Sequence, residues 1–262
     1  MDIQTLFGVK HKIVLVTGGS KGVGLMITKG FVKNGAKVYI SSRDTNSLNK
    51  ISAELTSEGP GSCIPIPANL QSLKDISALV KAIEEKEPGG IDILINNAGA
   101  TWGAKIDDYP YEGFTKVMNL NLNSVFFLSQ KLIPLLEKRG SFEDPSRIIN
   151  ISSIAGLIAS DNVFAYNASK AAVNHMSRGM AVALGPRNIT VNVIAPGPFP
   201  SKMMAETLRK NHDAIVSKIP LKRIGHPNDI VSASIYLSST AGSYITGTVL
   251  VVDGGNHIFP KL

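Results

Sequence analysis

Apolar and polar residues follow two alternating patterns along the 262-residue chain. Near-continuous apolar segments, typical of buried strands, occupy residues 12–19, 37–42, 62–70, 91–99, 147–153, 189–197 and 247–255. Between them, apolar residues recur at helical spacing over 23–35, 45–58, 72–87, 111–138 and 164–184, and in a helical pair at about 201–240. Apolar strands that each precede a helix predict a parallel sheet with helices on both faces. We therefore expect an α/β fold: one Rossmann-like, doubly wound domain over residues 1–262.

A glycine-rich turn, TGGSKGVG, joins the first predicted strand to the first predicted helix. Glycine allows the backbone to turn sharply there and to approach a pyrophosphate closely. The helix that follows presents free N–H groups and a partial positive charge to such an anion. The turn therefore indicates a dinucleotide site, and a purely structural strand-to-helix turn is the alternative. Its candidate cofactor-binding residues are Gly18, Ser20, Lys21, Gly22, Val23 and Gly24.

The end of the second predicted strand, ISSRD, indicates which cofactor the site prefers. An acid there would hold the ribose 2′-hydroxyl of NAD, whereas a basic residue accommodates the 2′-phosphate of NADP. Ser42 occupies the expected acid position and Arg43 follows it, while Lys21 adds a second positive charge. Guanidinium binds phosphate through strong, charge-assisted hydrogen bonds, so the sequence favours NADP(H). Asp44 keeps NAD open, although this acid lies beyond the strand and can pair with a neighbouring Lys or Arg.

The chain carries a formal net charge of +7 and has a pI of about 9.4. Its basic residues are dispersed, without a run of five and without a basic stripe that alternates with aromatic residues. This distribution argues against nucleic-acid binding and fits the attraction of a phosphorylated cofactor or an acyl carrier. The histidines are scattered without ligand spacing, so we expect no catalytic metal.

Targeting features are sparse. No apolar run reaches the roughly 18 residues of a membrane span, so no membrane association is expected. The N-terminal segment lacks the apolar core of a secretory signal, and the single cysteine, Cys63, cannot form an intrachain disulfide. These features predict a cytoplasmic protein. The C-terminal tripeptide PKL differs by one residue from the peroxisomal signal SKL, which leaves that compartment as the alternative.

Two polar segments lie at and after the end of the fifth predicted strand. NISSIAG ends the strand with Ser153, and YNASK places Tyr166 and Lys170 four residues apart at the start of the next helix. Their side chains then share one helix face, with Cβ atoms about 5–6 Å apart. Ligands bind at the carboxyl edge of parallel sheets, so both segments can face the cofactor. Taken alone, such a Tyr–Lys pair is more typical of an ordinary helix surface.

The ordered set of motifs resembles the short-chain dehydrogenase/reductase family, in its compact single-domain branch. The motifs are TGGSKGVG, NNAG, NLNLNSVF, ISSIAG, YNASK, APGPFPSKM and VVDGG, and they span nearly the whole chain. Within the branch, the sequence is most similar to NADPH-dependent β-ketoacyl reductases and carbonyl reductases, including β-ketoacyl reductases associated with rhamnolipid synthesis. The resemblance implies reduction of a ketone, either a 3-oxoacyl thioester or a small carbonyl compound, to an alcohol. It also implies a homotetramer or homodimer, with helices 111–138 and 164–184 between subunits.

The same resemblance implies a role for each candidate catalytic residue. Tyr166 would be the general acid that protonates the carbonyl oxygen, and Ser153 would orient that carbonyl. Lys170 would bind the nicotinamide ribose and lower the pKa of Tyr166, because a nearby ammonium and an oxidised nicotinamide favour the phenolate. Asn121 would hold a water that links Lys170 to bulk solvent.

Further cofactor contacts are implied in the same way. Asn97 and Gly99 would line the adenosine side, Asn69 and Leu70 would contact the adenine, and Phe199 and Ser201 would contact the nicotinamide amide. Asn69 departs from the family, which usually has an acid there, but its amide oxygen can still accept a hydrogen bond.

Residues 199–219 are a candidate substrate lid. The residues that would face an apolar substrate are Met203, Met204 and Leu208, and those that would meet an anionic carrier are Lys202, Arg209 and Lys210. An amphipathic helix packed on the body of the protein is the alternative.

Two other functions stay open on the sequence alone. One is an NAD-linked alcohol dehydrogenase that runs toward the ketone. The other is a cofactor-binding regulator without turnover, against which the complete set of Ser153, Tyr166 and Lys170 argues.

Overall fold

The computed structural model describes residues 2–201 and 204–258, and within them seven parallel strands form one sheet. The strands are β1 (Ile13–Thr17), β2 (Lys37–Ser41), β3 (Ser62–Pro65), β4 (Ile93–Asn96), β5 (Ser146–Ile151), β6 (Ile189–Pro196) and β7 (Val249–Val252). Their order is β3-β2-β1-β4-β5-β6-β7. Parallel pairing places every carboxyl end on one edge of the sheet, and the order changes direction between β1 and β4. Such a switch point is where doubly wound folds open a ligand crevice.

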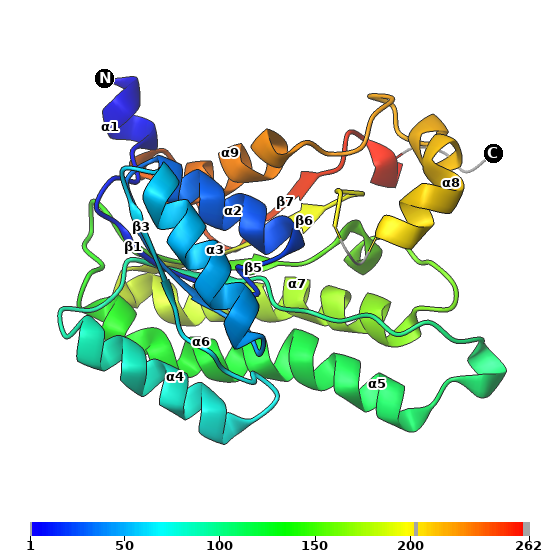
Figure 1. Ribbon diagram of the computed structural model, residues 1–262, viewed down its shortest axis with the longest axis horizontal. Coiled ribbons are helices and arrows are strands. Elements are labelled where there is room, and N and C mark those ends of the chain that lie inside the picture. The colour runs from blue at the N-terminus through cyan, green and yellow to red at the C-terminus, as the bar shows by residue number, and fades with distance from the viewer. Residues whose placement is uncertain (1, 202–203, 259–262) are drawn as a thin grey trace.

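Helices cover both faces of this sheet (Figure 1). One face carries α2 (Gly22–Lys33), α3 (Thr45–Glu58) and α9 (Pro227–Ser238), and the other carries α4 (Leu73–Lys86), α6 (Ser124–Glu137) and α7 (Phe164–Leu184). The other helical elements described are α1 (Ile3–Phe7), α5 (Tyr111–Met118), α8 (Ala205–Ser217), the π-helical segment η2 (Asn119–Asn123), and the 3₁₀ turns η1 (Ile106–Asp108), η3 (Ile154–Gly156), η4 (Gly185–Arg187), η5 (Thr240–Gly242) and η6 (Asn256–Ile258). No helix among the described residues is long and apolar enough to cross a bilayer. The predicted doubly wound sheet is confirmed.

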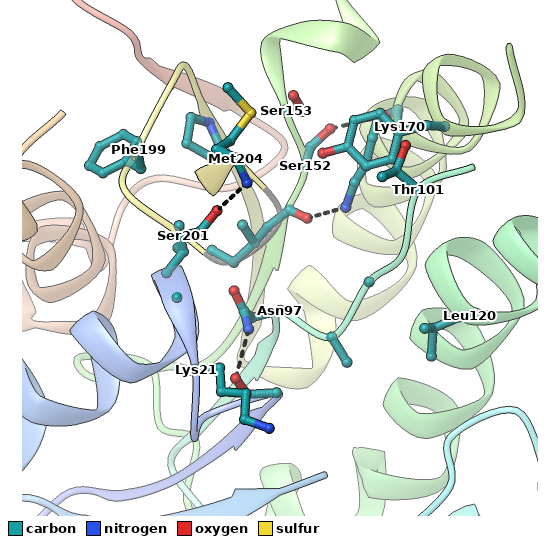
Figure 2. A pocket seen from close by; sticks show the side chains of 18 of the residues that line it. Lys21, Asn97, Thr101, Leu120, Ser152, Ser153, Lys170, Phe199, Ser201 and Met204 are labelled. Carbon is teal, nitrogen blue, oxygen red and sulfur yellow. Dashed lines mark hydrogen bonds between the residues drawn. The ribbon is translucent and has the colours of Figure 1, made fainter. Parts of the chain in front are cut away.

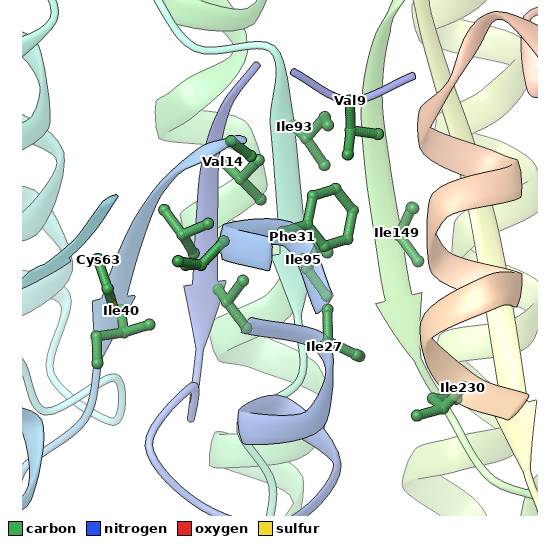
Figure 3. Packing of buried hydrophobic residues seen from close by; sticks show 14 of the residues in the cluster. Val9, Val14, Ile27, Phe31, Ile40, Cys63, Ile93, Ile95, Ile149 and Ile230 are labelled. Atoms are coloured by element: carbon green, nitrogen blue, oxygen red, sulfur yellow. The ribbon is translucent and has the colours of Figure 1, made fainter. Parts of the chain in front are cut away.

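Successive side chains of the central strands enter two separate cores. Val14 and Val16 of β1 pack with Ile27 and Phe31 of α2, as Figure 3 shows for that cluster. Leu15, between them, joins the cluster on the opposite face. All five side chains are fully buried. Burial on both faces explains why the strands are apolar throughout rather than alternating.

The ends of several elements differ from the prediction. The strand expected over 62–70 is limited to Ser62–Pro65, because proline has no N–H for a ladder and two prolines lie in this segment. The helix expected over 111–138 is divided by the π-helical segment Asn119–Asn123. The N-terminal helix α1 was not predicted, since five residues carry too little periodicity to be recognised.

Candidate active site

A cavity of about 970 Å³ opens at the carboxyl edge of the sheet (Figure 2). It is lined by the glycine turn, by residues that follow β2, β4, β5 and β6, and by the first turn of α7. The predicted site residues that line it are Gly18, Ser20, Lys21, Gly22, Val23, Ser42, Arg43, Asn69, Leu70, Asn97, Gly99, Ser153, Tyr166, Lys170, Phe199 and Ser201. Gly24 and Asn121 are not among the lining residues. The fold therefore brings segments far apart in the sequence to one site.

The glycine turn depends on glycine at three positions for different reasons. Gly18 and Gly22 have φ angles of +65° and +54°, in the left-handed region that favours glycine. A Cβ on Gly24 would lie 2.3 Å from Nδ2 of Asn97 and 2.4 Å from the carbonyl oxygen of Gly18. That Asn97 amide donates to the carbonyl oxygen of Thr17 at 2.9 Å and so fastens the turn to the segment after β4. The turn therefore places the N-terminus of α2 and its free N–H groups beside the cavity, which fits a pyrophosphate.

Replacing Gly24 by alanine is expected to lower the free energy of unfolding by about 1–3 kcal/mol, because a Cβ overpacks this contact. Cofactor affinity should fall as well, since the backbone must shift to relieve the clash. Chemical denaturation and cofactor titration measure the two effects. Gly89→Ala is the matched control, because a Cβ there meets nothing within 4 Å. If the two variants had the same free energy of unfolding and the same cofactor affinity, the turn would not require glycine at position 24.

The corner beside β2 is basic and holds unsatisfied hydroxyl groups. Arg43 is exposed at the cavity rim. The buried hydroxyls of Ser41 and Ser42 line the cavity and have no hydrogen-bond partner among the described residues. Buried polar groups are usually paired, so these two hydroxyls indicate a site shaped for a polar ligand.

Asp44 also lines the cavity, but both of its carboxylate oxygens are engaged by the protein. Its Oδ2 pairs with Nζ of Lys21 at 2.8 Å, and its Oδ1 accepts from the backbone N–H of Ser47 at the start of α3. The expected pairing of Asp44 with a neighbouring cation is confirmed. The same contact means that Lys21 shares its charge with Asp44, so Arg43 remains the principal cation of this corner.

Tyr166 and Lys170 lie at the far end of the cavity. The Lys170 ammonium is buried, donates to the carbonyl oxygen of Ile151 at 2.8 Å and lies 5.6 Å from the centroid of the Tyr166 ring. Ser153 lies two residues beyond the end of β5 rather than within the strand as predicted. It caps η3 by accepting from the N–H of Ala155 at 3.1 Å, and its hydroxyl also hydrogen-bonds Tyr166. A phenol, a hydroxyl and an ammonium thus converge at one place.

The protein environment shifts the pKa values of this group. Burial raises the pKa of Tyr166, and the hydrogen bond from Ser153 opposes that shift. Burial lowers the pKa of Lys170 to about 8. In the protein alone, removal of the phenol from water outweighs the favourable contacts. The predicted lowering of the Tyr166 pKa includes the charge of an oxidised nicotinamide and stays a prediction. A phenol with a raised pKa remains protonated at neutral pH, as a proton donor must.

Asn121 occupies the π-helical segment behind the cavity wall. Its Oδ1 accepts from the N–H of Ala100 at 2.8 Å, and its Nδ2 donates to the carbonyl oxygen of Ala100 at 2.9 Å and to Oγ of Ser169 at 3.0 Å. Both amide hydrogens are used by the protein, so the side chain braces the loop after β4 against α7. Gly99 leaves room for this brace, since a Cβ there would be 3.3 Å from Oδ1 of Asn121. The predicted water-holding role remains a prediction.

The residues predicted to contact the adenine and the nicotinamide are held by contacts within the protein. Oδ1 of Asn69 accepts from the N–H of Gln71 at 3.3 Å, and Leu70 is buried beside it. Phe199 is buried, and a Cβ on Gly225 would lie 2.3 Å from its ring. These contacts fix the residues in place, while their cofactor roles stay predictions.

The candidate lid is only partly described. Ser201 lies against the glycine turn, since a Cβ on Gly22 would be 3.2 Å from the Ser201 Cβ. Met204 and Thr207, at the start of α8, line the cavity. Lys202 and Met203 lie outside the described residues, as does the C-terminal PKL.

Several lining residues were not predicted from the sequence. Thr101, Ser160 and Val163 lie in loops whose path depends on contacts with other parts of the chain. Thr17 was also missed: its Oγ1 accepts from the N–H groups of Asn97 and Ala98 at 2.9 and 3.0 Å. Its position directly before the first glycine was the signal that could have identified it.

The described residues contain no cluster of three or more His, Cys, Asp or Glu side chains that could hold a metal ion. The residues that line the cavity fit an organic ligand rather than a metal ion. Three features fit a phosphorylated dinucleotide: the extent of the lining from Arg43 past the glycine turn to Tyr166, the glycines Gly18 and Gly22 in that turn, and the serine hydroxyls without a partner among the described residues.

Comparison with known proteins agrees with this geometry. Residues 18–257 match a family model described as Enoyl-(Acyl carrier protein) reductase. The chain is 42% identical over 255 residues to a rhamnolipids biosynthesis 3-oxoacyl-[acyl-carrier-protein] reductase of Pseudomonas aeruginosa, covering 96% of this chain and 98% of that protein. It is 34% identical to a 3alpha-hydroxysteroid dehydrogenase of Mediterraneibacter gnavus, covering 94% and 97%.

Among solved structures, the Pseudomonas aeruginosa RhlG/NADP active-site complex superimposes with a TM-score of 0.92 at 42% identity. The match covers 97% of this chain and 99% of that one. The resemblance inferred from the motifs, including that to the rhamnolipid-associated reductases, is confirmed. The sheet order, the Ser153–Tyr166–Lys170 group at its edge and these matches lead to one conclusion: the chain belongs to the short-chain dehydrogenase/reductase family.

Proposed function

We propose that the chain is an NADPH-dependent oxidoreductase that reduces a ketone to an alcohol. One observation carries the proposal: Tyr166, Ser153 and Lys170 meet at one end of a cavity whose other end carries Arg43. The guanidinium would hold the 2′-phosphate, and the remaining predicted cofactor residues would line the dinucleotide between these two ends. The whole chain is proposed to act as a single domain.

The side chains of the chain suit proton transfer to a carbonyl oxygen. When bound, NADPH would supply the hydride. Tyr166 would donate its proton to the carbonyl oxygen as negative charge develops there. Ser153 would give a second hydrogen bond to that oxygen and so orient the carbonyl. Lys170, held by the Ile151 carbonyl, would place a positive charge beside the phenolate that Tyr166 becomes.

The substrate is proposed to be a 3-oxoacyl thioester or a small carbonyl compound. The similarity to the 3-oxoacyl-[acyl-carrier-protein] reductase of Pseudomonas aeruginosa supports the thioester, and the similarity to the hydroxysteroid dehydrogenase supports a ketone without a carrier. NADPH oxidation followed against 3-oxoacyl thioesters and ring ketones tests the proposal and separates the two classes. Cofactor binding without oxidation on the entire panel would instead favour a regulator.

The reduction rate is expected to depend on the charge of Lys170. Burial sets the Lys170 pKa at about 8, so the ammonium is present below that pH and lost above it. Tyr166 stays protonated across this range, because burial raises its pKa. We expect kcat/KM for reduction to be constant below pH of about 8 and to fall up to about tenfold per unit above it. Measuring kcat/KM against pH tests this expectation, and unfolding midpoints at each pH show whether the protein stays folded. A kcat/KM that stays constant up to about pH 10 would contradict a role for the Lys170 charge.

A homotetramer or homodimer is proposed, with α6 and α7 between subunits. An apolar hollow of about 420 Å³ on these helices supports it. It is lined by Leu122, Asn123, Phe126, Phe127, Ala172, His175 and Met176. The mass in solution by light scattering decides between monomer, dimer and tetramer. The proposed compartment is the cytoplasm.

A further inference from the structure

The loop between Ser153 and Tyr166 is fastened by the residue that follows the proton donor. The 3₁₀ turn η3 ends at Gly156 and α7 begins at Phe164, so residues 157–163 connect the two. Asn167 makes two hydrogen bonds to Ser160 in this loop. Its Nδ2 donates to the Ser160 carbonyl oxygen at 2.6 Å, and its Oδ1 accepts from the Ser160 hydroxyl at 3.1 Å. We refer to this Asn167–Ser160 pair as the loop clamp.

The clamped loop forms part of the cavity rim. Ser160 and Val163 line the cavity together with Tyr166, while Asn167 itself does not. On its other side, the loop is tied to the segment after β4, because the Asn162 carbonyl oxygen accepts from the N–H of Ala104 at 2.9 Å. Any movement of the loop therefore changes the space in front of the proton donor.

The loop needs an anchor of this kind. Asn162 has a φ of +62°, in the left-handed region that asparagine adopts more readily than most residues and that turns the chain sharply before α7. Val163, the N-cap residue of α7, makes no side-chain cap hydrogen bond, and uncapped helix ends are prone to fray. Tyr166 is the third residue of this uncapped turn. By holding Ser160, Asn167 restrains the loop and the first turn of α7 together.

We propose that Asn167 is a positioning residue that sets substrate specificity through the loop clamp. With the clamp intact, the rim at Ser160 stays in place, holds a small ketone close to Tyr166 and obstructs a bulky one. Without the loop clamp, the loop at Ser160 can move away from Tyr166. The small ketone then loses a contact, and the bulky ketone gains access to Tyr166. The inference rests on the proposed reductase function.

Kinetics with two ketones of one ring type test this proposal, cyclohexanone as the small one and a bicyclic decalone as the bulky one. Asn167→Ala is expected to raise the decalone-to-cyclohexanone ratio of kcat/KM about tenfold, through the KM values. Ser160→Ala removes only the hydroxyl bond and should raise the ratio less. Adding Ser160→Ala to Asn167→Ala should change nothing further, since the partner is already lost. The KM for NADPH should change by less than about twofold in each variant.

Asn34→Ala is the matched control. Asn34 is an exposed asparagine whose amide donates to the Gly30 carbonyl oxygen at 2.8 Å, at the C-terminus of α2. Its replacement removes a similar hydrogen bond at the opposite edge of the sheet. The ketone ratio should stay at the wild-type value. A parallel rise in this variant would show that the ratio reports general loosening and would overturn the proposal.

Hydrogen exchange measured on the protein without cofactor tests the loop clamp independently of the reaction. The Ala104 amide, which bonds the Asn162 carbonyl, should exchange about tenfold faster in Asn167→Ala than in wild type or Asn34→Ala. Unchanged exchange overturns the proposal. Faster exchange with an unchanged ketone ratio also overturns it, and marks the clamp as purely structural. Absence of turnover by the wild-type protein on every ketone would overturn the proposed function itself.

Discussion

Replacing Tyr166 by phenylalanine is expected to reduce kcat for ketone reduction by about 10²–10⁴-fold. The variant keeps the ring and loses only the hydroxyl, the group placed to protonate the carbonyl oxygen. Without that proton, the developing negative charge on oxygen is left with the Ser153 hydrogen bond alone. Steady-state NADPH oxidation measures kcat, and a binding titration should show that cofactor affinity is retained.

Tyr109→Phe provides the matched control for the loss of a phenol hydroxyl. The Tyr109 hydroxyl donates to the Trp102 carbonyl oxygen at 2.9 Å, and its ring packs edge-on against Phe164 at the start of α7. Its variant should keep kcat within about threefold of wild type, because no reacting group is removed. A Tyr166→Phe enzyme as active as Tyr109→Phe would contradict the assignment of Tyr166 as the general acid.

Replacing Arg43 by alanine is expected to raise the KM for NADPH by about 10–100-fold and to leave the KM for NADH nearly unchanged. A charge-assisted hydrogen bond contributes about 1.5–3 kcal/mol, and only NADPH carries the 2′-phosphate that would accept it. Lys21 cannot fully compensate, because it already pairs with Asp44. Steady-state kinetics with both cofactors at a fixed ketone concentration measures the two KM values.

Arg187→Ala controls for the general loss of a positive charge. Arg187 is an exposed guanidinium that pairs with Glu137 and lies just before β6, at the edge of the sheet opposite the cavity. Its removal should change neither KM. If Arg43→Ala affected both cofactors equally, the phosphate assignment would be wrong and the NAD-linked alternative would gain support.

The sequence predicted the fold because burial on both faces makes each strand apolar throughout. Val14, Leu15 and Val16 illustrate this, since neighbouring residues enter opposite cores and all must be apolar. The site was predictable where function depends on spacing within one segment. Gly18, Gly22 and Gly24 share a turn, and Tyr166 and Lys170 share a helix face.

Contacts between distant segments could not be predicted. Asn121 reaches Ala100 and Ser169, which lie 21 and 48 residues away. Asn167 looks like an ordinary helix residue until the loop containing Ser160 is placed beside it. The degree to which a side chain is removed from water also depends on the assembled fold. The resemblance suggested a lowered Tyr166 pKa from nearby positive charge, but the burial that raises this pKa in the protein alone could not be seen in the sequence.

A single-turnover experiment with NADPH that carries deuterium in both hydrogen positions of its reactive carbon tests the central claim most directly. After reaction with a ketone that the wild-type protein accepts, the alcohol is examined by mass spectrometry. We predict one deuterium on the former carbonyl carbon in the wild-type reaction, at a rate that falls about 10²–10⁴-fold in Tyr166→Phe. An alcohol without deuterium, or equal rates in the two proteins, would contradict hydride transfer from NADPH with Tyr166 as the proton donor.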